Sequence, residues 1–474
     1  MADAHHAQLL ARLDASCRRP VLTFLVSAVA WLLLGSLLAL IASIKLHSPE
    51  FMADAEWLTF GRVRAAHLNA VAYGWAAMAA LGVLLWLVPR LTRAPLRGPT
   101  WLVGVGWVWN ALVTLGVSAI LAGYSTSVEW LEFPLPIALC LAVCFAAVAI
   151  AAIDMLVRRQ VEHIYVSLWY LTAVMVWFPV LYLTANIGLH GGVLTGVAQS
   201  MTNWWFAHNV LGLFVTPIAL GTLYYVLPKV IGRPIHSYYL SLVGFWALAL
   251  FYNWAGLHHL VGGPVPMWAV TVGIVASMMM LIPVATVAYN QHMTMRGHFH
   301  LLRTSPALRF VVFGGMSYFV VSVQGSFEAL RGMSEVVHFT QYTVGHAHLG
   351  MYGFFSMIMF GAYYFVLPRL TGREWPSPAL IQVHFWCSAI GIGVYFVALT
   401  IGGIQQGLLL ADASVPFLEV VQATMPWLQA RSISGLALTV AHLAFAAGVA
   451  GTVFGGPSQD RAPTLLGQPA GGGA

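Results

Sequence analysis

Charged side chains are scarce in this chain: Asp, Glu, Lys and Arg together make up 8% of its 474 residues. Soluble globular domains carry about 25% charged residues, so the composition excludes a water-soluble enzyme or a disordered chain. The basic residues are scattered rather than clustered, which also excludes nucleic acid as a partner. Hydrophobic residues make up 60% of the chain. These proportions predict a polytopic membrane protein whose surroundings are the lipid bilayer.

Cysteine motifs are also missing. The four cysteines, Cys17, Cys140, Cys144 and Cys387, form neither a CxxC nor a CxxCH motif. Without CxxCH, the chain cannot attach a c-type haem covalently. Cys140 and Cys144 lie one helical turn apart in an apolar stretch, where two buried small side chains are expected rather than a site. The N-terminus lacks a cleavable signal pattern and is typical of a short cytoplasmic tail.

Twelve mostly apolar stretches are long enough to cross a bilayer, which requires about 20 residues in a helix. They are predicted at 21–44, 62–88, 101–123, 134–156, 164–188, 203–230, 238–262, 266–289, 307–331, 338–367, 378–402 and 434–455. We therefore expect an all-α integral membrane protein with a twelve-helix bundle over residues 21–455. Residues 1–20 are expected to form a cytoplasmic tail, and the low-complexity residues 456–474 a second, flexible one.

The basic residues in short loops predict the orientation, because cytoplasmic loops are enriched in Lys and Arg. Of the 21 basic residues, 16 lie in the N-terminus and in the loops after even-numbered stretches. The other five are Lys45, Arg62, Arg64, Arg331 and Arg431. Both termini are therefore expected on the cytoplasmic side.

Six histidines fall inside predicted spans, where titratable groups are costly and usually functional. They are His67 on the second span, His208 on the sixth, His258 and His259 on the seventh, and His346 and His348 on the tenth. With the predicted orientation, all six lie at one depth near the outer face. Eight others are assigned to loops or tails: His5, His6, His47, His190, His236, His292, His298 and His300. Because imidazole binds iron and copper well, six histidines at one depth indicate metal centres.

Two histidine pairs have informative spacings. His346 and His348 are two residues apart on a helix, so their side chains point about 200° apart and can ligate two metals, which suits two haems. His258 and His259 precede Gly262–Gly263–Pro264, where a helix must end or distort. The adjacent imidazoles can then converge on one small ion. His208 would be a third ligand, leaving one coordination position open for a small substrate.

This distribution of ligands over twelve spans resembles subunit I of the haem–copper oxygen reductases. Oxidases like the mitochondrial enzyme carry a cross-linked tyrosine four residues after the first copper-ligand histidine, where this chain has Gly212. Tyr252 instead precedes His258 by six residues in FWALALFYNWAGLHH. In this respect the chain is similar to the C family, the cbb-type cytochrome c oxidases. The segments GRVRAAHLNAV, LYYVLPK, SYYLSLVGFW and TVGHAHLG match the same family.

The resemblance implies a terminal respiratory oxidase in the inner membrane of a bacterium. Such an enzyme reduces dioxygen to water with electrons from membrane-anchored c-type cytochrome subunits and translocates protons. The implied ligands are His67 and His348 for a low-spin haem b, His346 for a high-spin haem b, and His208, His258 and His259 for copper. Tyr252 would be joined covalently to His208 and supply an electron and a proton to bound dioxygen.

The resemblance also assigns residues around these centres. The family's calcium ion would be held in part by Glu129. Arg62 and Arg64 lie within five residues of His67 on the outer side, and Arg64 is the better candidate to pair with the anionic haem propionates, with His338 as a further one. The family's proton route would include the hydroxyl groups of Thr216, Tyr224, Ser241 and Tyr318. A solvated loop carboxylate remains an alternative for Glu129, and ordinary polar side chains remain an alternative for the hydroxyls.

Two positions depart from the family. Gln324 stands where the family usually has a glutamate, and Gly244 where many members have a histidine. Because Gln324 cannot carry a proton as a carboxylate does, the family's role for that glutamate is in doubt here. Glu328, one turn further out, could substitute or could face the outer rim.

Two other functions stay open. A nitric oxide reductase of the same superfamily would have a glutamate ligand at position 212 and no tyrosine like Tyr252, so both Gly212 and Tyr252 argue against it. A non-catalytic transporter or di-haem electron-transfer protein would need His67, His346 and His348, but would not need the other three histidines.

Overall fold

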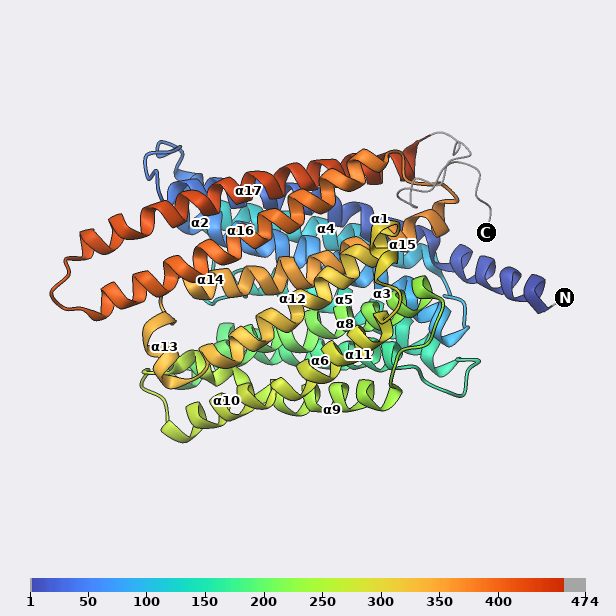
Figure 1. The fold of residues 1–474 in the computed structure, drawn as a ribbon, viewed down its shortest axis with the longest axis horizontal. Helices are drawn as coiled ribbons and strands as arrows, with labels where there is room; N and C mark the ends of the chain where they lie inside the picture. The colour runs from blue at the N-terminus through green and yellow to red at the C-terminus, as the bar shows by residue number, and fades with distance from the viewer. Residues whose placement is uncertain (1, 456–474) are drawn as a thin grey trace.

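The computed structural model describes residues 2–455, which form twelve helical spans packed side by side in one bundle (Figure 1). No β-strand occurs within residues 2–455. The predicted all-α bundle of twelve spans is therefore confirmed. The first helix starts and the last helix ends at the same end of the bundle (Figure 1), as an even number of spans requires.

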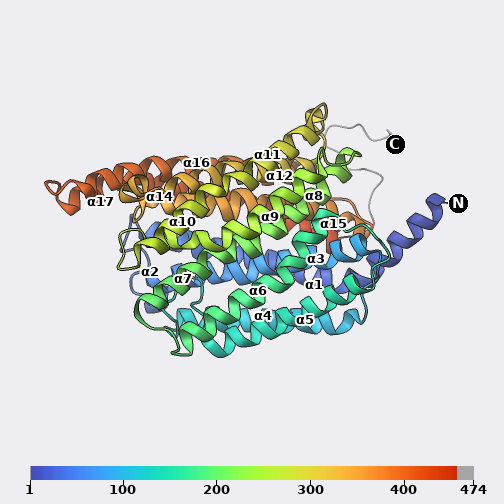
Figure 2. The same cartoon turned by 90° about the horizontal axis from the view of Figure 1, so that it is seen from below.

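Besides the last span, seven spans are single helices, one of which has a short distorted end. They are α1 (Ala2–Lys45), α4 (Pro99–Leu121), α5 (Leu135–Val157), α6 (Val166–His190), α12 (Pro306–Glu328), α16 (Pro378–Ala411) and α9 (Tyr238–Ala255), which continues into η4 (Gly256–Leu260). A long final helix, α17 (Phe417–Phe454), is the twelfth span. Helices α16 and α17 extend beyond the other spans at the end away from the N-terminus (Figures 1 and 2).

The other four spans are built from consecutive segments. The second is α2 (Phe60–Asn69), η2 (Ala70–Ala76) and α3 (Ala77–Thr92); the sixth is α7 (Gly196–Val210), η3 (Leu211–Val215) and α8 (Thr216–Ile231). The eighth is α10 (Met267–Met279) and α11 (Leu281–Met295); the tenth is α14 (Gln341–His348), η6 (Leu349–Ser356) and α15 (Met357–Thr371). The connections contain η1 (Glu56–Leu58), η5 (Phe299–Arg303) and α13 (Arg331–Val337).

Two predicted boundaries were wrong. Residues 2–20 are not a separate tail, because α1 runs without interruption from Ala2 through Pro20 into the first span. The twelfth span begins at Phe417 rather than 434, since Pro426 and Arg431 interrupt the apolar run without ending the helix. Helix length is therefore underestimated wherever a polar helical extension adjoins the apolar stretch. The predicted tail at 456–474 lies outside the described residues.

The second, sixth and tenth spans form the centre of the bundle. Their apolar cores are 89%, 94% and 83% buried, whereas the other spans range from 33% to 61%. Four of the six predicted ligand histidines lie on these three enclosed spans, and the other two lie at the end of the seventh. The bundle thus places its polar metal-binding side chains where lipid cannot reach them.

Every span with a predicted ligand departs from α-helical geometry beside that ligand. The segments η2, η3 and η6 are π-helical; η2 and η3 each begin three residues after a histidine, His67 and His208 respectively, and η6 begins directly after His348. His258 and His259 lie in η4, a 3-10 segment. Single π-helical turns are rare and concentrate at functional sites, because the wider turn re-aims the neighbouring side chains. These distortions therefore mark one functional region.

Candidate metal centres

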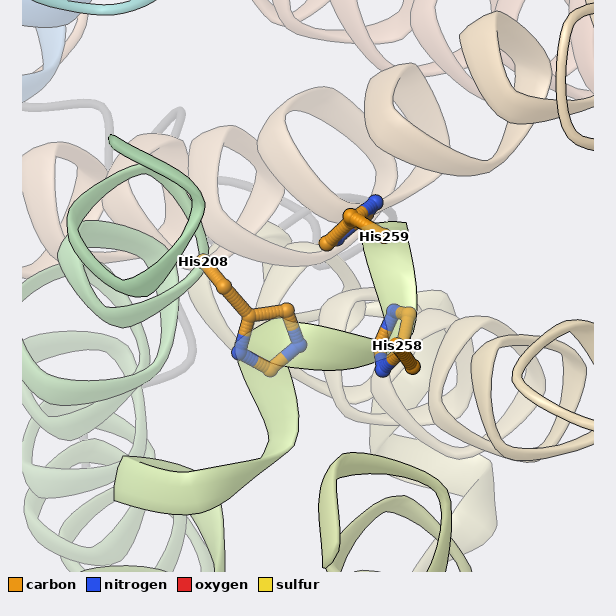
Figure 3. A group of neighbouring side chains, drawn as sticks. All are labelled: His208, His258 and His259. Atoms are coloured by element: carbon orange, nitrogen blue, oxygen red, sulfur yellow. The ribbon is translucent and has the colours of Figure 1, made fainter. Parts of the chain in front are cut away.

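Three imidazoles converge at one point between the sixth and seventh spans. The available ligand atoms of His208, His258 and His259 all lie within 4.8 Å of one another. Figure 3 shows His208 approaching from α7 and the adjacent pair from η4. Among the described residues this is the one group of three or more His, Cys, Asp or Glu side chains so arranged. Three imidazoles at this spacing could hold one transition-metal ion.

The local backbone explains how neighbouring histidines can share an ion. Three residues per turn in η4 change the direction of successive side chains, and Gly262 turns the chain immediately afterwards with φ of +81°. Glycines also let the backbones approach. A Cβ on Gly256 would lie 2.6 Å from the carbonyl oxygen of Trp204, and one on Gly273 would lie 2.7 Å from the His258 nitrogen. The sequence prediction of a distorted helix end is therefore confirmed.

Ser277 on α10 determines which nitrogen of His258 is free. Its hydroxyl donates to the carbonyl oxygen of Gly273 at 2.7 Å, and its oxygen also lies 2.7 Å from His258 Nδ1. A serine has one proton to donate, so its oxygen must accept from Nδ1–H of His258. The lone pair of His258 Nε2 is therefore left for a metal, which is the usual arrangement of a ligand histidine and its supporting partner.

His208 has a complementary feature. Its Nδ1 is buried and has no hydrogen-bond partner among the described residues. Buried polar atoms are rarely unpartnered, because desolvation without a new bond costs free energy. That nitrogen faces away from His258 and His259, whereas Nε2 of His208 faces them (Figure 3). The three converging imidazoles fit the copper ion that the sequence implies.

His67 on α2 and His348 on α14 form a second pair, between the second and tenth spans. Their rings are 8° from parallel with centres 6.5 Å apart. Nδ1 of His67 donates to the carbonyl oxygen of Gly35 at 2.9 Å, and Nδ1 of His348 to that of Val344 at 2.8 Å. Both Nε2 atoms are thereby left as ligands. Two metal–imidazole bonds of about 2 Å, with about 1.1 Å from nitrogen to ring centre, separate ring centres by roughly 6 Å. The spacing therefore fits one iron between two axial imidazoles.

His346 lies on the other side of the same helix. Its Nδ1 is 3.2 Å from Oε1 of Gln324, whose Nε2 donates to Thr400 at 3.3 Å. Because the amide oxygen can only accept, His346 donates from Nδ1 and keeps Nε2 free. The nearest Glu328 oxygen is 3.8 Å from Nδ1, beyond hydrogen-bonding distance. The neutral amide oxygen of Gln324 thus accepts the hydrogen bond from His346 Nδ1, and a carboxylate is not required to orient the ring.

Internal space adjoins all six of these histidines. Each of them is half-buried, although each lies in the interior of the bundle. The exposed part of these rings therefore faces space between the helices. On the side of α12 the His346 ring is closely packed: a Cβ on Gly325 would lie 2.7 Å from His346 Cε1, so position 325 has no room for a side chain. Prosthetic groups held by these histidines would need such space beside their ligands.

Tyr252 lies directly beside the three-histidine cluster. Its ring centre is 4.4 Å from that of His208, at 31° between planes. A Cβ on residue 212 would lie only 1.8 Å from Tyr252 Cε1. The tyrosine of the seventh span therefore occupies the space that any side chain of Gly212 would need.

Of the three residues assigned to propionates and calcium, Arg64 and Glu129 lie together and His338 lies in another segment. Arg64 donates to Glu129 Oε1 at 2.7 Å, so these two predicted residues form one ion pair at the bundle's edge. Asn203 donates to the Glu129 carbonyl oxygen at 3.0 Å. His338 follows α13 and stacks on the exposed Phe339, with ring centres 4.3 Å apart. Burial lowers the pKa of His338 from its usual value.

The four hydroxyl residues of the predicted proton route are buried. Ser241 donates to the carbonyl oxygen of Tyr238 at 2.6 Å, and Thr216 begins α8. Tyr224 stacks on Tyr170 with ring centres 6.1 Å apart. The hydroxyl of Tyr318 has no hydrogen-bond partner among the described residues and lies on α12. Together these hydroxyl groups provide polar atoms inside the otherwise apolar sixth, seventh and ninth spans.

Arg431 is a residue that the sequence analysis did not assign to the site. Its Nη1 donates to Gln341 Oε1 at 3.3 Å, and its guanidinium lies 5.6 Å from the centre of the Tyr395 ring. Tyr395 in turn packs on His348 at 4.7 Å. Nε of Arg431 is buried without a partner among the described residues. The mistaken start of the twelfth span placed Arg431 in a loop, although a lone arginine inside a span would have been a signal.

The set of histidines inside spans was also incomplete. His384 on α16 and His442 on α17 are 0% and 4% exposed and were not considered. Four histidines assigned to loops or tails lie within α-helices α1, α6 and α11: His5, His6, His190 and His292. Unlike the six predicted ligands, His384 and His442 adjoin no internal space.

Comparisons with known proteins agree with this arrangement. The family model for cytochrome c and quinol oxidase polypeptide I matches residues 19–437. The cbb3-type cytochrome c oxidase subunit CcoN1 of Stutzerimonas stutzeri is 32% identical over 425 residues, covering 87% of this chain and 90% of that protein. Cytochrome c oxidase subunit 1 of Rhodobacter capsulatus is 32% identical over 448 residues, covering 90% and 84%. A solved haem–copper terminal oxidase dimer has a TM-score of 0.74 over 96% of this chain and 86% of its own; at 16% identity, it shows the fold alone.

Proposed function

This chain belongs to the family of cytochrome c and quinol oxidase polypeptide I, the haem–copper oxidases. We propose that it is the catalytic subunit of a cbb-type cytochrome c oxidase. The family accounts for the twelve spans and the general reaction, the reduction of dioxygen. The cbb type is the finer proposal. It is supported by the relative in Stutzerimonas stutzeri, which is named as a cbb3-type subunit.

The position of Tyr252 carries this proposal. A phenol that takes part in oxygen reduction must lie beside the copper ligands, and the Tyr252 ring is 4.4 Å from that of His208. Its origin on the seventh span is the feature shared with the cbb-type enzymes. A nitric oxide reductase would need a glutamate ligand at position 212, yet the Tyr252 ring fills the space beside Gly212. A di-haem electron-transfer protein would have no use for the three-histidine cluster.

The ligands divide among three metals. We assign His67 and His348 to a low-spin haem b, His346 to a high-spin haem b, and the remaining three to copper: His208, His258 and His259. When bound, these groups supply electrons for the cleavage of dioxygen. The protein contributes fixed tautomers, through Ser277 and the carbonyl oxygens behind the rings, so that the Nε2 lone pairs of His258, His67 and His348 are available without rearrangement. Tyr252, which we propose is covalently joined to His208, contributes an electron and a proton.

Basic side chains are available for the haem propionates. Arg431 has a buried Nε without a partner and lies one ring away from His348, so we add it to Arg64 and His338 as a propionate-binding residue. Guanidinium pairs with carboxylates by short, charge-assisted hydrogen bonds. Glu129, held by Arg64, remains the residue we propose for a calcium ion.

Protons would reach this centre through the hydroxyls of Thr216, Tyr224, Ser241 and Tyr318. Their burial on the sixth, seventh and ninth spans supports this route, because buried hydroxyls can pass a proton between an acceptor and a donor. The loop charges support cytoplasmic termini and an outer position for the metals in a bacterial inner membrane. Electrons would therefore enter from membrane-anchored c-type cytochrome subunits on the outer side, since this chain has no CxxCH motif.

Metal analysis and one pair of optical spectra test the assignment. The purified complex, after subtraction of the iron of its c-type haems, should contain two irons and one copper per chain. The reduced spectrum should show b-type haem, and carbon monoxide should perturb one of the two b haems. A third iron with no copper would instead indicate the reductase and overturn the proposal.

A further inference from the structure

Gln324 on α12 lies between His346 on α14 and Thr400 on α16, so three helices meet at one amide group. Its Oε1 is 3.2 Å from His346 Nδ1, and its Nε2 donates to the Thr400 hydroxyl at 3.3 Å. All three side chains are half-buried. Both polar ends of the amide are therefore used, one by a predicted ligand and the other by a residue to which the proposed function gives no part.

Glycines bring the three helices close together at this point. A Cβ on Gly345, the residue before His346, would lie 3.0 Å from the Cβ of Leu399, the residue before Thr400. A Cβ on Gly325 of α12 would lie 2.7 Å from Cε1 of the His346 ring. Both distances are shorter than ordinary van der Waals contact, so neither position has space for a side chain. The three backbones are thus fixed relative to one another.

The tautomer of His346 decides how the amide is oriented. An iron bound to Nε2 leaves the single proton of the neutral imidazole on Nδ1. The amide must then present its oxygen to Nδ1–H, which directs its nitrogen to Thr400. The threonine hydroxyl accepts from that nitrogen, in a place where a donor without a partner would be costly. Without this second bond the amide could rotate, because the terminal torsion of a glutamine is only weakly restrained.

A carboxyl group lies close to the same nitrogen. Glu328 is one turn after Gln324 on α12, and its nearest oxygen is 3.8 Å from His346 Nδ1, too far for a hydrogen bond. The two side chains thus compete for one N–H group. The amide, which Thr400 holds from a third helix, is the group in contact.

The acceptor at Nδ1 affects how a bound imidazole acts on its metal. A stronger acceptor makes the ligand more basic, and a more basic ligand stabilises oxidised iron over reduced iron. Hydrogen bonds to an ionised acceptor are roughly twice as strong as those between neutral groups. A neutral amide at this position therefore makes His346 less basic than a carboxylate would.

We propose that Thr400 is a positioning residue: it holds the Gln324 amide against His346 Nδ1, and thereby sets the basicity of His346 toward the iron that this histidine binds. This inference rests on the high-spin haem of the proposed function. It goes beyond that function because it identifies the side chain that fixes a neutral acceptor at the position where the family usually has a glutamate.

Resonance Raman spectroscopy of the intact reduced complex tests the proposal, because the iron–imidazole stretching frequency depends on the hydrogen bond at Nδ1. Thr400→Val keeps the shape of the side chain and removes the hydroxyl, so the frequency should fall as the Nδ1 bond weakens. Thr400→Ser keeps a hydroxyl and should give the parent frequency. Gln324→Leu has no acceptor and should lower the frequency at least as far as Thr400→Val.

The midpoint potential of the high-spin haem provides a second readout. It should rise in Thr400→Val and in Gln324→Leu, because a less basic ligand favours the reduced state. One hydrogen bond changes an equilibrium by up to about tenfold. A tenfold change is about 59 mV for a one-electron couple, which sets the upper limit of the expected shift. Thr400→Ser should stay at the parent value.

Two matched controls separate this role from packing. Thr439→Val on α17 removes a hydroxyl that donates within its own helix, to the carbonyl oxygen of Gly435 at 2.9 Å, and should keep both parent values. Glu328→Gln removes the nearby carboxyl group and should keep the parent frequency, since Glu328 makes no hydrogen bond to His346.

Two results would overturn the inference. One is a Thr400→Val protein with the parent's frequency and potential; Thr400→Ala makes the same test if the valine variant does not assemble. The other is a frequency that changes in Glu328→Gln but not in Gln324→Leu, which would make the carboxyl group the partner of His346. A parent whose reduced spectrum shows no b haem that carbon monoxide perturbs would instead refute the proposed function.

Discussion

The ring of Tyr252 fills the place where residue 212 would carry its side chain. A Cβ on Gly212 would lie 1.8 Å from Tyr252 Cε1, far inside van der Waals contact. Gly212 lies in the π-helical segment η3 and Tyr252 in α9, and both adjoin His208. The two positions therefore act as one unit, in which a side chain on one span excludes a side chain on the other.

This exclusion predicts the effect of the smallest possible change at position 212. Gly212→Ala should displace the Tyr252 ring from His208, because backbone on a central span cannot move aside easily. We expect at least a tenfold loss of oxygen consumption, with the low-spin haem band retained. Gly212→Ala combined with Tyr252→Ala, which restores space, should recover assembly and copper but not turnover. Normal turnover of the single variant would contradict the role given to this contact.

The two groups of histidines should be separable by mutation. His208→Ala or His258→Ala should abolish oxygen reduction and copper binding while leaving the low-spin spectrum largely intact, since those residues lie away from His67. His348→Ala should remove the low-spin band. Optical spectra of the three purified variants check this directly. A normal bis-histidine spectrum in His348→Ala would disprove the assignment.

Ser277 should affect copper binding only through its hydrogen bond with His258. Ser277→Ala removes the acceptor that fixes the Nδ1–H tautomer, and loss of such a supporting partner typically lowers metal affinity by about 10 to 100-fold. Ser277→Thr keeps the hydroxyl and should retain copper. Equilibrium copper retention against a graded chelator series would measure the difference. Equal retention in the alanine and threonine variants would show that Ser277 only packs.

The raised pKa of Glu132 predicts how the stability of the folded protein changes with pH. Its carboxylate accepts from Asn69 Nδ2 at 2.9 Å, and burial in the loop before α5 raises its pKa from 4.5 to about 7. The folded protein thus holds a proton that the unfolded chain has lost, and stability falls as the pH rises from about 4.5 to about 7. Above about pH 7 the free energy of unfolding is lower by an amount on the order of 3 kcal/mol than at low pH.

Glu132→Gln should therefore unfold at a higher temperature than the parent at pH 8, and at about the same temperature at pH 5. The exposed Glu335→Gln is a suitable control and should follow the parent at both pH values. Thermal unfolding in detergent provides the measurement. A destabilised Glu132→Gln protein at pH 8 would mean that the carboxylate is ionised and needed.

Much of the fold could be predicted from the sequence because each of the twelve spans contains an apolar run of sufficient length. The six histidines on four spans could be selected because each lies near one end of its span. The π-helical segments after His67 and His348 could not be predicted, since no Pro marks them. Pro217 follows the segment after His208, but a proline in a span indicates a distortion without identifying it as π-helical. Arg431 was missed for a different reason: polar residues within α17 obscured where the helix begins. His442 lies inside the predicted twelfth span but on none of the spans that carry the predicted ligands, so no pattern marked it.

Peptide mapping of the purified complex by mass spectrometry tests the central claim most directly. The account predicts that the peptide containing His208 is recovered covalently joined to the peptide containing Tyr252. In Tyr252→Phe, which keeps the ring's bulk, the joined peptide should vanish, both haems should remain, and oxygen reduction should fall at least tenfold because the phenolic electron and proton donor is gone. Recovery of the two peptides as separate species from the parent, together with near-normal turnover of Tyr252→Phe, would contradict the assignment of this chain to the cbb-type oxidases.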